Sequence, residues 1–207
     1  KYKLKVNKNL FQPINEMMKG IIIFYKDKSS KYADEKVFAG KSARELSKVW
    51  AYQLGNEVFT IDSDQAGSLV SLLEAAKAAC QKASADFAVF SYDDLPFLDL
   101  ALTQKMCASH AEYKCEYTFA DGYPYGFTPE IIDAGTLSIL LELARTSQAS
   151  LGQVPMSRDS IWNLIKTDVN SFEVESELAP HDWRLYRFAF NCGNKENFLQ
   201  SKALFEA

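Results

Sequence analysis

The chain has 207 residues, of which 47% are hydrophobic and 24% are charged, and its formal net charge is −4. This composition excludes an intrinsically disordered chain, and the acidic balance gives no reason to expect a nucleic acid or an anionic membrane as a partner. No apolar run has the length of a membrane span and no secretory signal opens the sequence, so we expect a cytoplasmic protein. The four cysteines lack metal-ligand spacing, which indicates free thiols.

The first half of the chain alternates between short apolar runs and helical patterns. Residues 1–17 are basic and lack periodicity, so we interpret them as a terminal extension or a lone strand. We expect residues 18–207 to form a single α/β domain that belongs to a longer protein. Apolar, β-branched runs predict strands over 19–25, 57–62, 86–92 and 113–119, and amphipathic patterns predict helices over 42–54, 67–83 and 98–110. Ser68 is the expected N-cap of the second helix, and Gly55 the stop of the first.

The second half is less regular. A turn-rich stretch over 120–136 precedes predicted helices over 137–147, 158–169 and 195–206 and predicted strands over 171–179 and 183–190. Alternating strands and helices indicate a parallel sheet with right-handed crossovers. The sequence therefore predicts a three-layer, Rossmann-like α/β sandwich with a mostly parallel mixed sheet. Ligands of such sheets bind at the carboxyl ends of the strands, where the strand order reverses.

Two carboxylates, Asp93 and Asp94, follow the third predicted strand in the stretch "FAVFSYDDLPFLDLALTQK". One interpretation is that they cap the next helix, with Pro96 in its first turn, and this is the more common role of such residues. The other is that they hold a hard cation such as Mg²⁺, which binds one or two carboxylates while phosphate oxygens and waters fill its remaining positions.

Basic residues gather around the connection between the first strand and the first helix. They are Lys26, Lys28, Lys31, Lys36, Lys41 and Arg44. Lysines on a loop that opens toward a helix bind a triphosphate as point charges, but no glycine-rich turn is present to bring the backbone close to phosphates. A solvated, charged loop explains the same pattern.

A third feature is the stretch "YTFADGYPYGFTPE", residues 117–130. Its glycines and prolines require special backbone geometry, and Tyr123, Tyr125 and Phe127 offer aromatic rings. These rings either stack a base or a sugar or anchor the loop to the core.

The segments "KGIIIFY", "EKVFAGKSARELSKVW" and "FAVFSYDDLPFLDLALTQKMCASH" together resemble nucleotidyltransferases of the GT-A type, the nucleotide-diphospho-sugar transferases. The resemblance implies that Asp94 is the catalytic aspartate that binds Mg²⁺ and that Lys36 is the catalytic lysine that contacts the triphosphate. It further implies a nucleotide-binding set and a substrate loop. The nucleotide-binding set is Tyr25, Lys26, Lys28, Ser91 and Asp93, and the substrate loop contains Asp121, Gly122, Tyr123, Tyr125 and Glu130.

A closer resemblance is to the amino-terminal domain of spiro-SPASM proteins, in which a nucleotidyltransferase-like domain precedes a radical S-adenosylmethionine barrel. "MKGIIIFY", "FAGKSARELS", "DDLPFLD" and "YTFADGYPYGFTPEII" carry it. The resemblance implies a covalently linked downstream domain that would hold the iron–sulfur cluster, because this chain has no C-x-x-x-C-x-x-C.

The chain departs from the nucleotidyltransferase pattern at two places. "YKDKSSKYADEK" stands where the glycine-rich phosphate loop belongs, and the second metal-binding acid would fall in "FAFNCGNKENF", where Asn191, Gly193, Asn194 and Glu196 stand. The leading hypothesis is therefore a nucleotidyltransferase-like domain with a degenerate phosphate loop that binds a nucleotide, sugar or peptide as the accessory domain of a larger protein. One alternative is an active magnesium-dependent nucleotidyltransferase that uses CTP or GTP and a phosphorylated or sugar acceptor and releases pyrophosphate. Another is a non-catalytic docking module that uses the aromatic loop as its interface.

Overall fold

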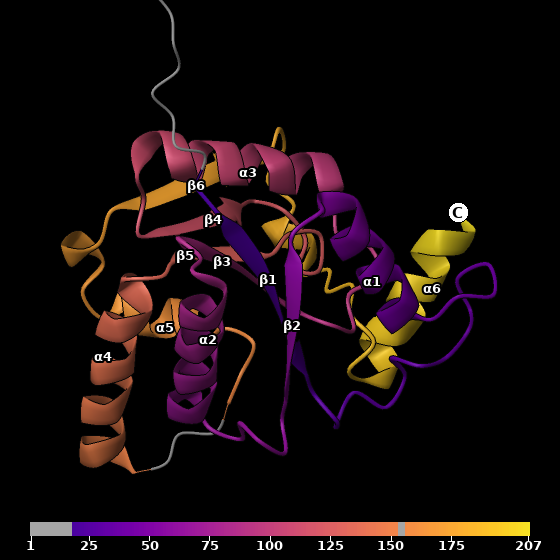
Figure 1. Ribbon diagram of the computed structural model, residues 1–207. Coiled ribbons are helices and arrows are strands. Elements are labelled where there is room, and N and C mark those ends of the chain that lie inside the picture. The colour runs from indigo at the N-terminus through magenta and orange to yellow at the C-terminus, as the bar shows by residue number, and fades with distance from the viewer. Residues whose placement is uncertain (1–17, 153–155) are drawn as a thin grey trace, which may run out of the picture.

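A six-stranded sheet forms the centre of the protein, as the computed structural model in Figure 1 shows. The structure describes residues 18–152 and 156–207, so the interpretation of residues 1–17 lies outside the described residues. The strands are β1 (Gly20–Lys26), β2 (Glu57–Asp62), β3 (Phe87–Tyr92), β4 (Tyr117–Asp121), β5 (Glu130–Asp133) and β6 (Val174–Leu178).

The strand order is β2-β1-β3-β5-β4-β6. β1 pairs in parallel with β2 and with β3, and β4 pairs in parallel with β6, whereas β5 runs antiparallel to both of its neighbours. This is the predicted mostly parallel mixed sheet. The chain goes from β1 to β2 on one side and then to β3 on the other, so the strand order reverses between β1 and β3.

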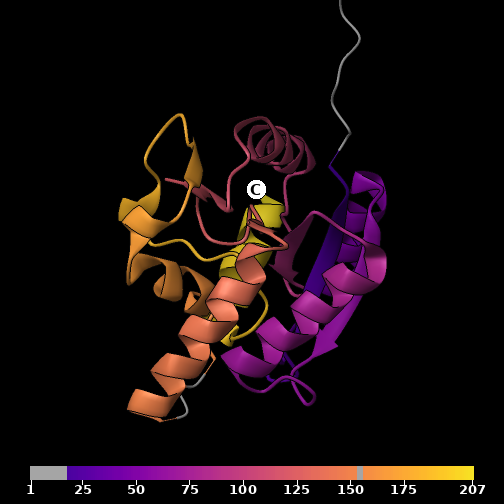
Figure 2. The same cartoon turned by 60° about the vertical axis from the view of Figure 1, so that its left-hand side comes forward.

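Helices cover both faces of the sheet and complete the three predicted layers. On one face lie α1 (Ala43–Leu54) and α3 (Leu100–Tyr113), and on the other lie α2 (Leu69–Ala83), α4 (Thr136–Leu151) and α5 (Ser160–Lys166). α2 and α4 run side by side in Figure 2. β1 is buried on both sides, because Ile21 and Ile23 pack toward α2 and α4 while Ile22 and Phe24 pack toward α1 and α3. This two-sided burial explains the continuous apolar run in its sequence.

Local capping signals set the helix boundaries. Ser42 and Glu45 form a capping box at the start of α1, and Gly55 ends that helix in the left-handed conformation. The side chain of Ser68 caps α2 by accepting a hydrogen bond from the amide of Ser71. The roles predicted for Gly55 and Ser68 are therefore confirmed.

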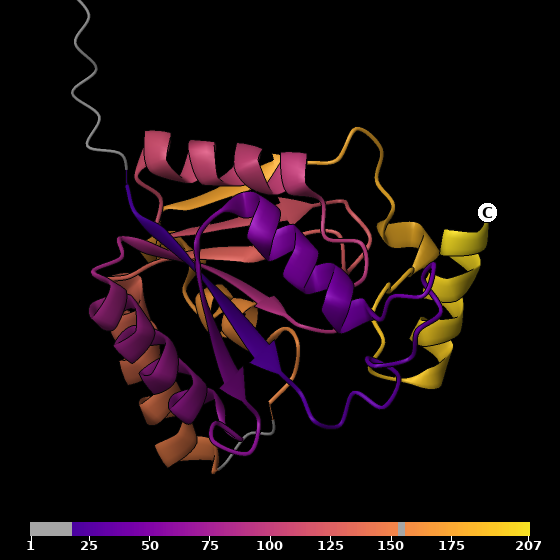
Figure 3. The ribbon, with the colours of Figure 1, turned by 45° about the vertical axis from the view of Figure 1, so that its right-hand side comes forward.

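The last helix, α6 (Lys195–Glu206), packs against the connection between β1 and α1, far away in the sequence (Figure 3). The ring of Tyr32 stacks on that of Phe198 with centroids 4.9 Å apart, and Phe38 meets Phe205 edge-on at 5.5 Å. The carboxyl-terminal helix thus holds the long β1–α1 connection against the end of the sheet.

Two predictions of the strands differ from the structure. The predicted strand over 183–190 is wrong: residues Arg184–Tyr186 form the 3-10 helix η2, and Arg187 has a positive φ of 51°, which breaks the extended conformation. Only one isolated bridge, between Tyr125 and Ala189, remains there among the described residues. The strand predicted to start at Tyr113 begins at Tyr117, because Tyr113 is the last residue of α3.

Two short elements were not predicted at all. They are β5, inside the turn-rich stretch, and the 3-10 helix η1 (Val169–Ser171). In the part of the chain that the structure describes, no helix combines the length and apolar character that crossing a bilayer requires. All four cysteines are free.

Candidate functional site

The carboxyl ends of β1 and β3 meet at the point where the strand order reverses, and the acidic pair lies there. Asp93 follows β3, and its amide donates a hydrogen bond to the carbonyl of Tyr25 in β1 at 3.3 Å. Neither carboxylate caps α3, because Asp99 occupies that N-cap and accepts from the amide of Leu102. The capping interpretation of the acidic pair is therefore wrong.

Asp94 is 1% exposed, and an arginine occupies both of its carboxylate oxygens. Arg158 donates from Nη1 to Oδ1 at 2.9 Å and from Nη2 to Oδ2 at 2.6 Å, and Ser30 Oγ also donates to Oδ2 at 2.8 Å. A bidentate arginine–carboxylate pair is strong and geometrically specific. Both oxygens of the Asp94 carboxylate thus already have partners within the protein itself.

The Arg158 guanidinium is held from two further sides. It lies over the ring of Tyr92 at 4.4 Å and near the ring of Tyr125 at 5.7 Å, and Nη1 donates to the Tyr125 hydroxyl at 3.2 Å. Guanidinium groups stack favourably on aromatic faces. Arg158 therefore has one defined position between Asp94 and these two tyrosines.

Asp93 has a different partner. Its Oδ2 accepts from Arg44 Nε at 2.9 Å, whereas its Oδ1 is buried with no hydrogen-bond partner among the described residues. Burial raises the pKa of the Asp93 carboxyl to about 6, although the neighbouring Arg44 guanidinium opposes the shift and Asp94 adds to it. Arg44 is the one member of the basic group that contacts the acidic pair in the part of the chain that the structure describes.

The lysines predicted to hold a triphosphate form ion pairs with other carboxylates. Lys36 Nζ lies 3.4 Å from Oε1 of Glu45 in the first turn of α1, and Lys26 Nζ lies 3.3 Å from Oδ1 of Asp62. Lys28 pairs with Asp64. The structure therefore does not bring Lys36 together with Asp94, and its role in a triphosphate site stays a prediction.

The segment in which the resemblance expects a second metal-binding acid does lie against the Asp94–Arg158 pair. The amide of Cys192 donates to the carbonyl of Asp94 at 3.0 Å. At Gly193 an added Cβ would lie 2.9 Å from Arg158 Nη2 and 3.3 Å from Asp94 Oδ2, so a side chain there would press on the Asp94–Arg158 pair. Asn191 Oδ1 accepts from the amide of Gly193 at 3.1 Å.

In this arrangement the Asp94 carboxylate and the groups around it do not fit a resident Mg²⁺. Both oxygens of Asp94 already accept from Arg158 or Ser30, and within residues 18–152 and 156–207 no three His, Cys, Asp or Glu side chains gather as a metal-binding group. A guanidinium supplies the positive charge that Mg²⁺ would bring. The prediction of Mg²⁺ at Asp94 stays a prediction, and binding there would first require Arg158 to move.

An open cavity of about 410 Å³ adjoins this pair at the ends of β1 and β3, and we call it the edge cavity. Tyr25 and Tyr92 form part of its wall, with ring centroids 5.4 Å apart, and the Tyr25 hydroxyl donates to the carbonyl of Ala66 at 3.0 Å. The complete lining is Tyr25, Asp27, Ser29, Gly67, Tyr92, Met156, Ser157 and Arg158. Of the predicted nucleotide-binding residues, Tyr25 lines the edge cavity, whereas the buried Ser91 lines a separate, 30 Å³ space behind it.

The predicted substrate loop divides into two parts. Asp121 forms an ion pair with Arg184 at 3.0 Å, and Gly122, with a φ of 81°, accepts at its carbonyl from the amide of Trp183. Both therefore lie beside the segment that leads into η2. The other three members line a second cavity of about 190 Å³ on the far side of Arg158, and they are Tyr123, Tyr125 and Glu130.

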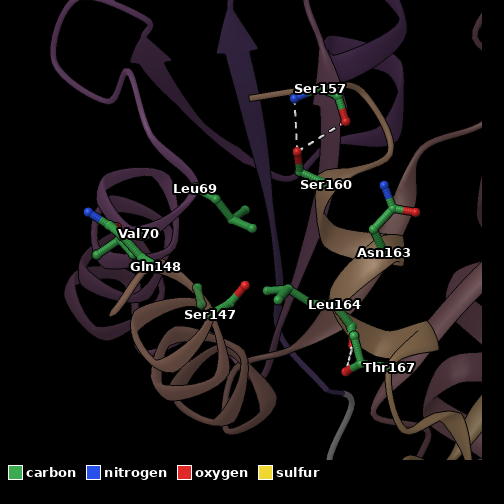
Figure 4. A pocket seen from close by; sticks show the side chains of 10 residues that line it. Leu69, Val70, Ser147, Gln148, Ser157, Ser160, Asn163, Leu164 and Thr167 are labelled. Atoms are coloured by element: carbon green, nitrogen blue, oxygen red, sulfur yellow. Dashed lines mark hydrogen bonds between the residues drawn. The ribbon is translucent and has the colours of Figure 1, made fainter. Parts of the chain in front are cut away.

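A further cavity, of about 220 Å³, lies between α2, α4 and α5 (Figure 4). Four aliphatic residues, among them Leu69 and Leu164, and six neutral polar residues form its wall, and Ser157 and Ser160 are hydrogen-bonded to each other. Its ten lining residues include no carboxylate, amine, imidazole or thiol, so it offers no group for acid–base or charge-transfer chemistry. The edge cavity and the cavity lined by Tyr123, Tyr125 and Glu130, in contrast, both have Arg158 and a carboxylate in their walls.

Sequence reasoning missed Arg158 altogether. It lies 64 residues after Asp94 in the chain, just before a helix, and nothing in "SRDSIW" distinguishes it from a surface arginine. Arg44 belongs to the basic group that the sequence indicated, but its choice of Asp93 as partner depends on the fold.

Comparisons with known proteins place this geometry in context. No protein-family model matches the chain. A curated relative, an uncharacterized protein from Treponema pallidum, is 40% identical over 52 residues, which cover 25% of this chain and 24% of that protein. The match thus spans about a quarter of that relative's length.

Solved structures match nearly the whole chain. A cytidylyltransferase from Leptospira borgpetersenii superposes with a TM-score of 0.64 at 18% identity and covers 89% of this chain and 86% of its own. The 4-diphosphocytidyl-2C-methyl-D-erythritol synthase from Anaerococcus prevotii has a TM-score of 0.59 at 11% identity, with 91% and 99% covered. A nucleotidyl transferase from Methanothermobacter has a TM-score of 0.57 at 13% identity, with 92% and 98% covered. At these identities the likeness concerns the fold, and the chain has the nucleotidyltransferase-like fold of these proteins.

Proposed function

We propose that this chain is a nucleotidyltransferase-like domain that binds a nucleotide or a sugar-like ligand in the edge cavity without transferring a nucleotidyl group. It would do so as the accessory domain of a larger protein, one that carries a radical S-adenosylmethionine barrel. The fold supports ligand binding at this place, because open α/β sheets bind ligands where their strand order reverses. Fold alone does not define an activity, so the proposal depends on the site.

One observation carries the proposal: the bidentate contact between Arg158 and Asp94. The resemblance to GT-A nucleotidyltransferases gives Asp94 the role of magnesium ligand, and here a guanidinium has both of its oxygens. Nucleotidyl transfer depends on positioned positive charge around the reacting phosphates. With Asp94 held by Arg158 and with no glycine-rich loop, this site retains the means to bind and lacks the means to catalyse.

The edge cavity has features that suit a base or a sugar. The rings of Tyr25 and Tyr92 offer aromatic surface, and Asp27 and Ser29 offer a carboxylate and a hydroxyl at its wall. Its volume of about 410 Å³ falls within the usual range for small-molecule sites. The charged end of the ligand would face Arg158.

Calorimetric titration with CTP and with GTP, each in the presence of MgCl₂ and again with EDTA, tests the proposal. We expect one of these nucleotides to bind equally well in both conditions and to release no pyrophosphate on prolonged incubation. Ser29→Trp, which fills the edge cavity, should abolish the heat, whereas Glu112→Trp on the exposed face of α3 should leave it unchanged. Magnesium-dependent binding with pyrophosphate release would establish an active nucleotidyltransferase instead. Absence of heat with nucleotides and nucleotide sugars alike would contradict ligand binding.

A second candidate function is docking, and one surface favours it. The segment from the end of β6 to residue 188 exposes large apolar side chains: Leu178 is 70% exposed, Leu185 85% and Tyr186 62%. Several large exposed apolar side chains on one segment favour an interaction site. Amide exchange of residues 178–188, measured in this chain and in the longer protein, tests the candidate. Added protection in the longer protein would support docking to a linked domain, and unchanged exchange would contradict it.

A further inference from the structure

The cavity on the far side of Arg158 has an aromatic wall, and we call it the aromatic cavity. It has a volume of about 190 Å³ and lies between β4, the loop that follows β4, the start of β5 and α5. Its aromatic lining residues are Tyr117, Phe119, Tyr123, Tyr125 and Trp162. Loop 121–129, which closes it, is part of the predicted substrate loop.

The rings are fixed by one another. Trp162 stacks on Tyr117 with centroids 5.7 Å apart and planes at 12°, and it lies 4.8 Å from the Phe119 centroid. Lys166 Nζ already lies 5.9 Å from the Trp162 centroid, which shows that a cation reaches this cluster. Aromatic rings attract cations through their quadrupoles, most strongly where water is excluded.

A carboxylate with one incompletely satisfied oxygen lies in the same wall. Glu130 is the first residue of β5, where it pairs with Phe90, and its Oε2 is buried with no donor among the described residues. Buried polar atoms in proteins almost always have a partner. A carboxylate oxygen that the chain leaves without a closely placed donor, at a cavity wall, offers a position for a donor from outside the chain.

The charges around Glu130 select the kind of donor. From the segment before α5, the Asp159 carboxylate and the Arg158 guanidinium line the cavity, and Arg158 is already paired with Asp94. From β4 and the loop, the neighbouring titratable groups are the Tyr117 and Tyr125 hydroxyls, whose pKa values burial raises, so both stay neutral. Burial raises the pKa of Glu130 to about 7, with the charge of Asp159 adding to the shift and a hydrogen bond from the Tyr117 hydroxyl opposing it. An excess of negative charge thus faces the cavity above that pH.

We propose that the aromatic cavity binds a small organic cation through a primary ammonium group, which donates to Glu130 Oε2 and lies against the aromatic rings. An anion would be repelled by Glu130 and Asp159. A quaternary ammonium would leave Oε2 without a donor, and a neutral alcohol would leave the excess charge uncompensated. The inference goes beyond the proposed function, since it concerns a separate cavity and requires no nucleotide.

Titration of the whole chain with n-butylammonium chloride at pH 8, followed by calorimetry, tests the proposal. We expect saturable binding in the millimolar range, as is usual for a fragment of this size. Butan-1-ol and tetramethylammonium chloride should each bind at least about tenfold more weakly, because the first lacks the charge and the second lacks the N–H donors. Lowering the pH to 5.5 should weaken butylammonium binding, since Glu130 then carries a proton.

Glu130→Gln provides the direct comparison, because it keeps the shape of the side chain and removes its charge. It should weaken butylammonium binding at pH 8 by at least about tenfold and abolish the pH dependence. Glu142→Gln, an exposed glutamate on α4, is the matched control and should bind as the wild type does. Equal binding of butylammonium and butan-1-ol, or an unchanged affinity in Glu130→Gln, would overturn the proposal, and so would no binding of butylammonium. If the amine fails to bind while a nucleotide still does, this inference falls and the proposed function stands.

Discussion

Replacing Arg158 by methionine should destabilise the protein severely, because it leaves the Asp94 carboxylate buried without its cation. Asp94 is 1% exposed, and after the change only Ser30 would still donate to its side chain. Removal of one partner from a buried ion pair costs about 3–5 kcal/mol. The stacking of the guanidinium on Tyr92 at 4.4 Å, worth about 0.5–2 kcal/mol, is lost as well, though the methionine side chain keeps part of the packing. We expect a loss of about 3–5 kcal/mol, a large part of the stability of a typical domain.

Equilibrium unfolding in urea, followed by tryptophan fluorescence, measures the effect. Arg145→Met is the matched control: Arg145 bridges two exposed glutamates on the surface, and its loss should cost less than about 1 kcal/mol. In the Asp94→Asn background Arg158→Met leaves no carboxylate at position 94 without its cation, so it should cost at least about 2 kcal/mol less than in the wild type. If Arg158→Met costs no more than Arg145→Met, or costs the same in both backgrounds, the bidentate pair does not form as described.

Three further predictions concern stability. The raised pKa of Glu130 means that the folded state holds this proton more tightly than the unfolded chain does. The stability that Glu130 contributes is therefore full below about pH 4.5 and is lost as the pH rises through about 7. Between pH 5 and pH 8 the free energy of unfolding of Glu130→Gln should therefore rise by about 1–3 kcal/mol relative to that of the wild type. If the difference between the two proteins is the same at both pH values, the carboxyl is not buried as described. Gly126→Ala should destabilise by more than about 3 kcal/mol or prevent folding, because its Cβ would lie 2.1 Å from the carbonyl oxygen of Phe190. Gly40→Ala, also at positive φ but with no atom within 4 Å of the added Cβ, should cost only about 1 kcal/mol, and similar urea midpoints for the two variants would refute the contact. Asp99→Ala removes the N-cap of α3 and should cost about 1 kcal/mol in the same assay, and no loss would show that the cap is not used.

The sequence predicts the β2-β1-β3 half of the sheet well because each signal there is local. β1 and β3 are apolar on both faces, Ser68 caps α2 through its side-chain hydrogen bond, and Gly55 ends α1 because it adopts the left-handed conformation easily. β5 gave no such signal. It has four residues, follows Pro129 directly, and is a strand only because β3 and β4 each offer it an edge.

The sequence does not predict which charged residues pair with each other. The position of Asp94 at a strand end follows from its local pattern, but the cation that meets it comes from 64 residues away. Lys36 and Arg44 are equally basic in sequence, yet Lys36 turns to the exposed Glu45 while Arg44 reaches the buried Asp93. Pairing of this kind depends on the direction of each side chain in the folded protein.

The contacts of Asp94 tie together three stretches of chain that are remote in sequence: the connection after β1 through Ser30, the turn before α5 through Arg158, and the approach to α6 through the amide of Cys192. Asp94 thus cross-links the first two stretches through its carboxylate and the third through its backbone carbonyl. Because Arg158 lines both cavities, a ligand that displaced it in one cavity would also change the wall of the other.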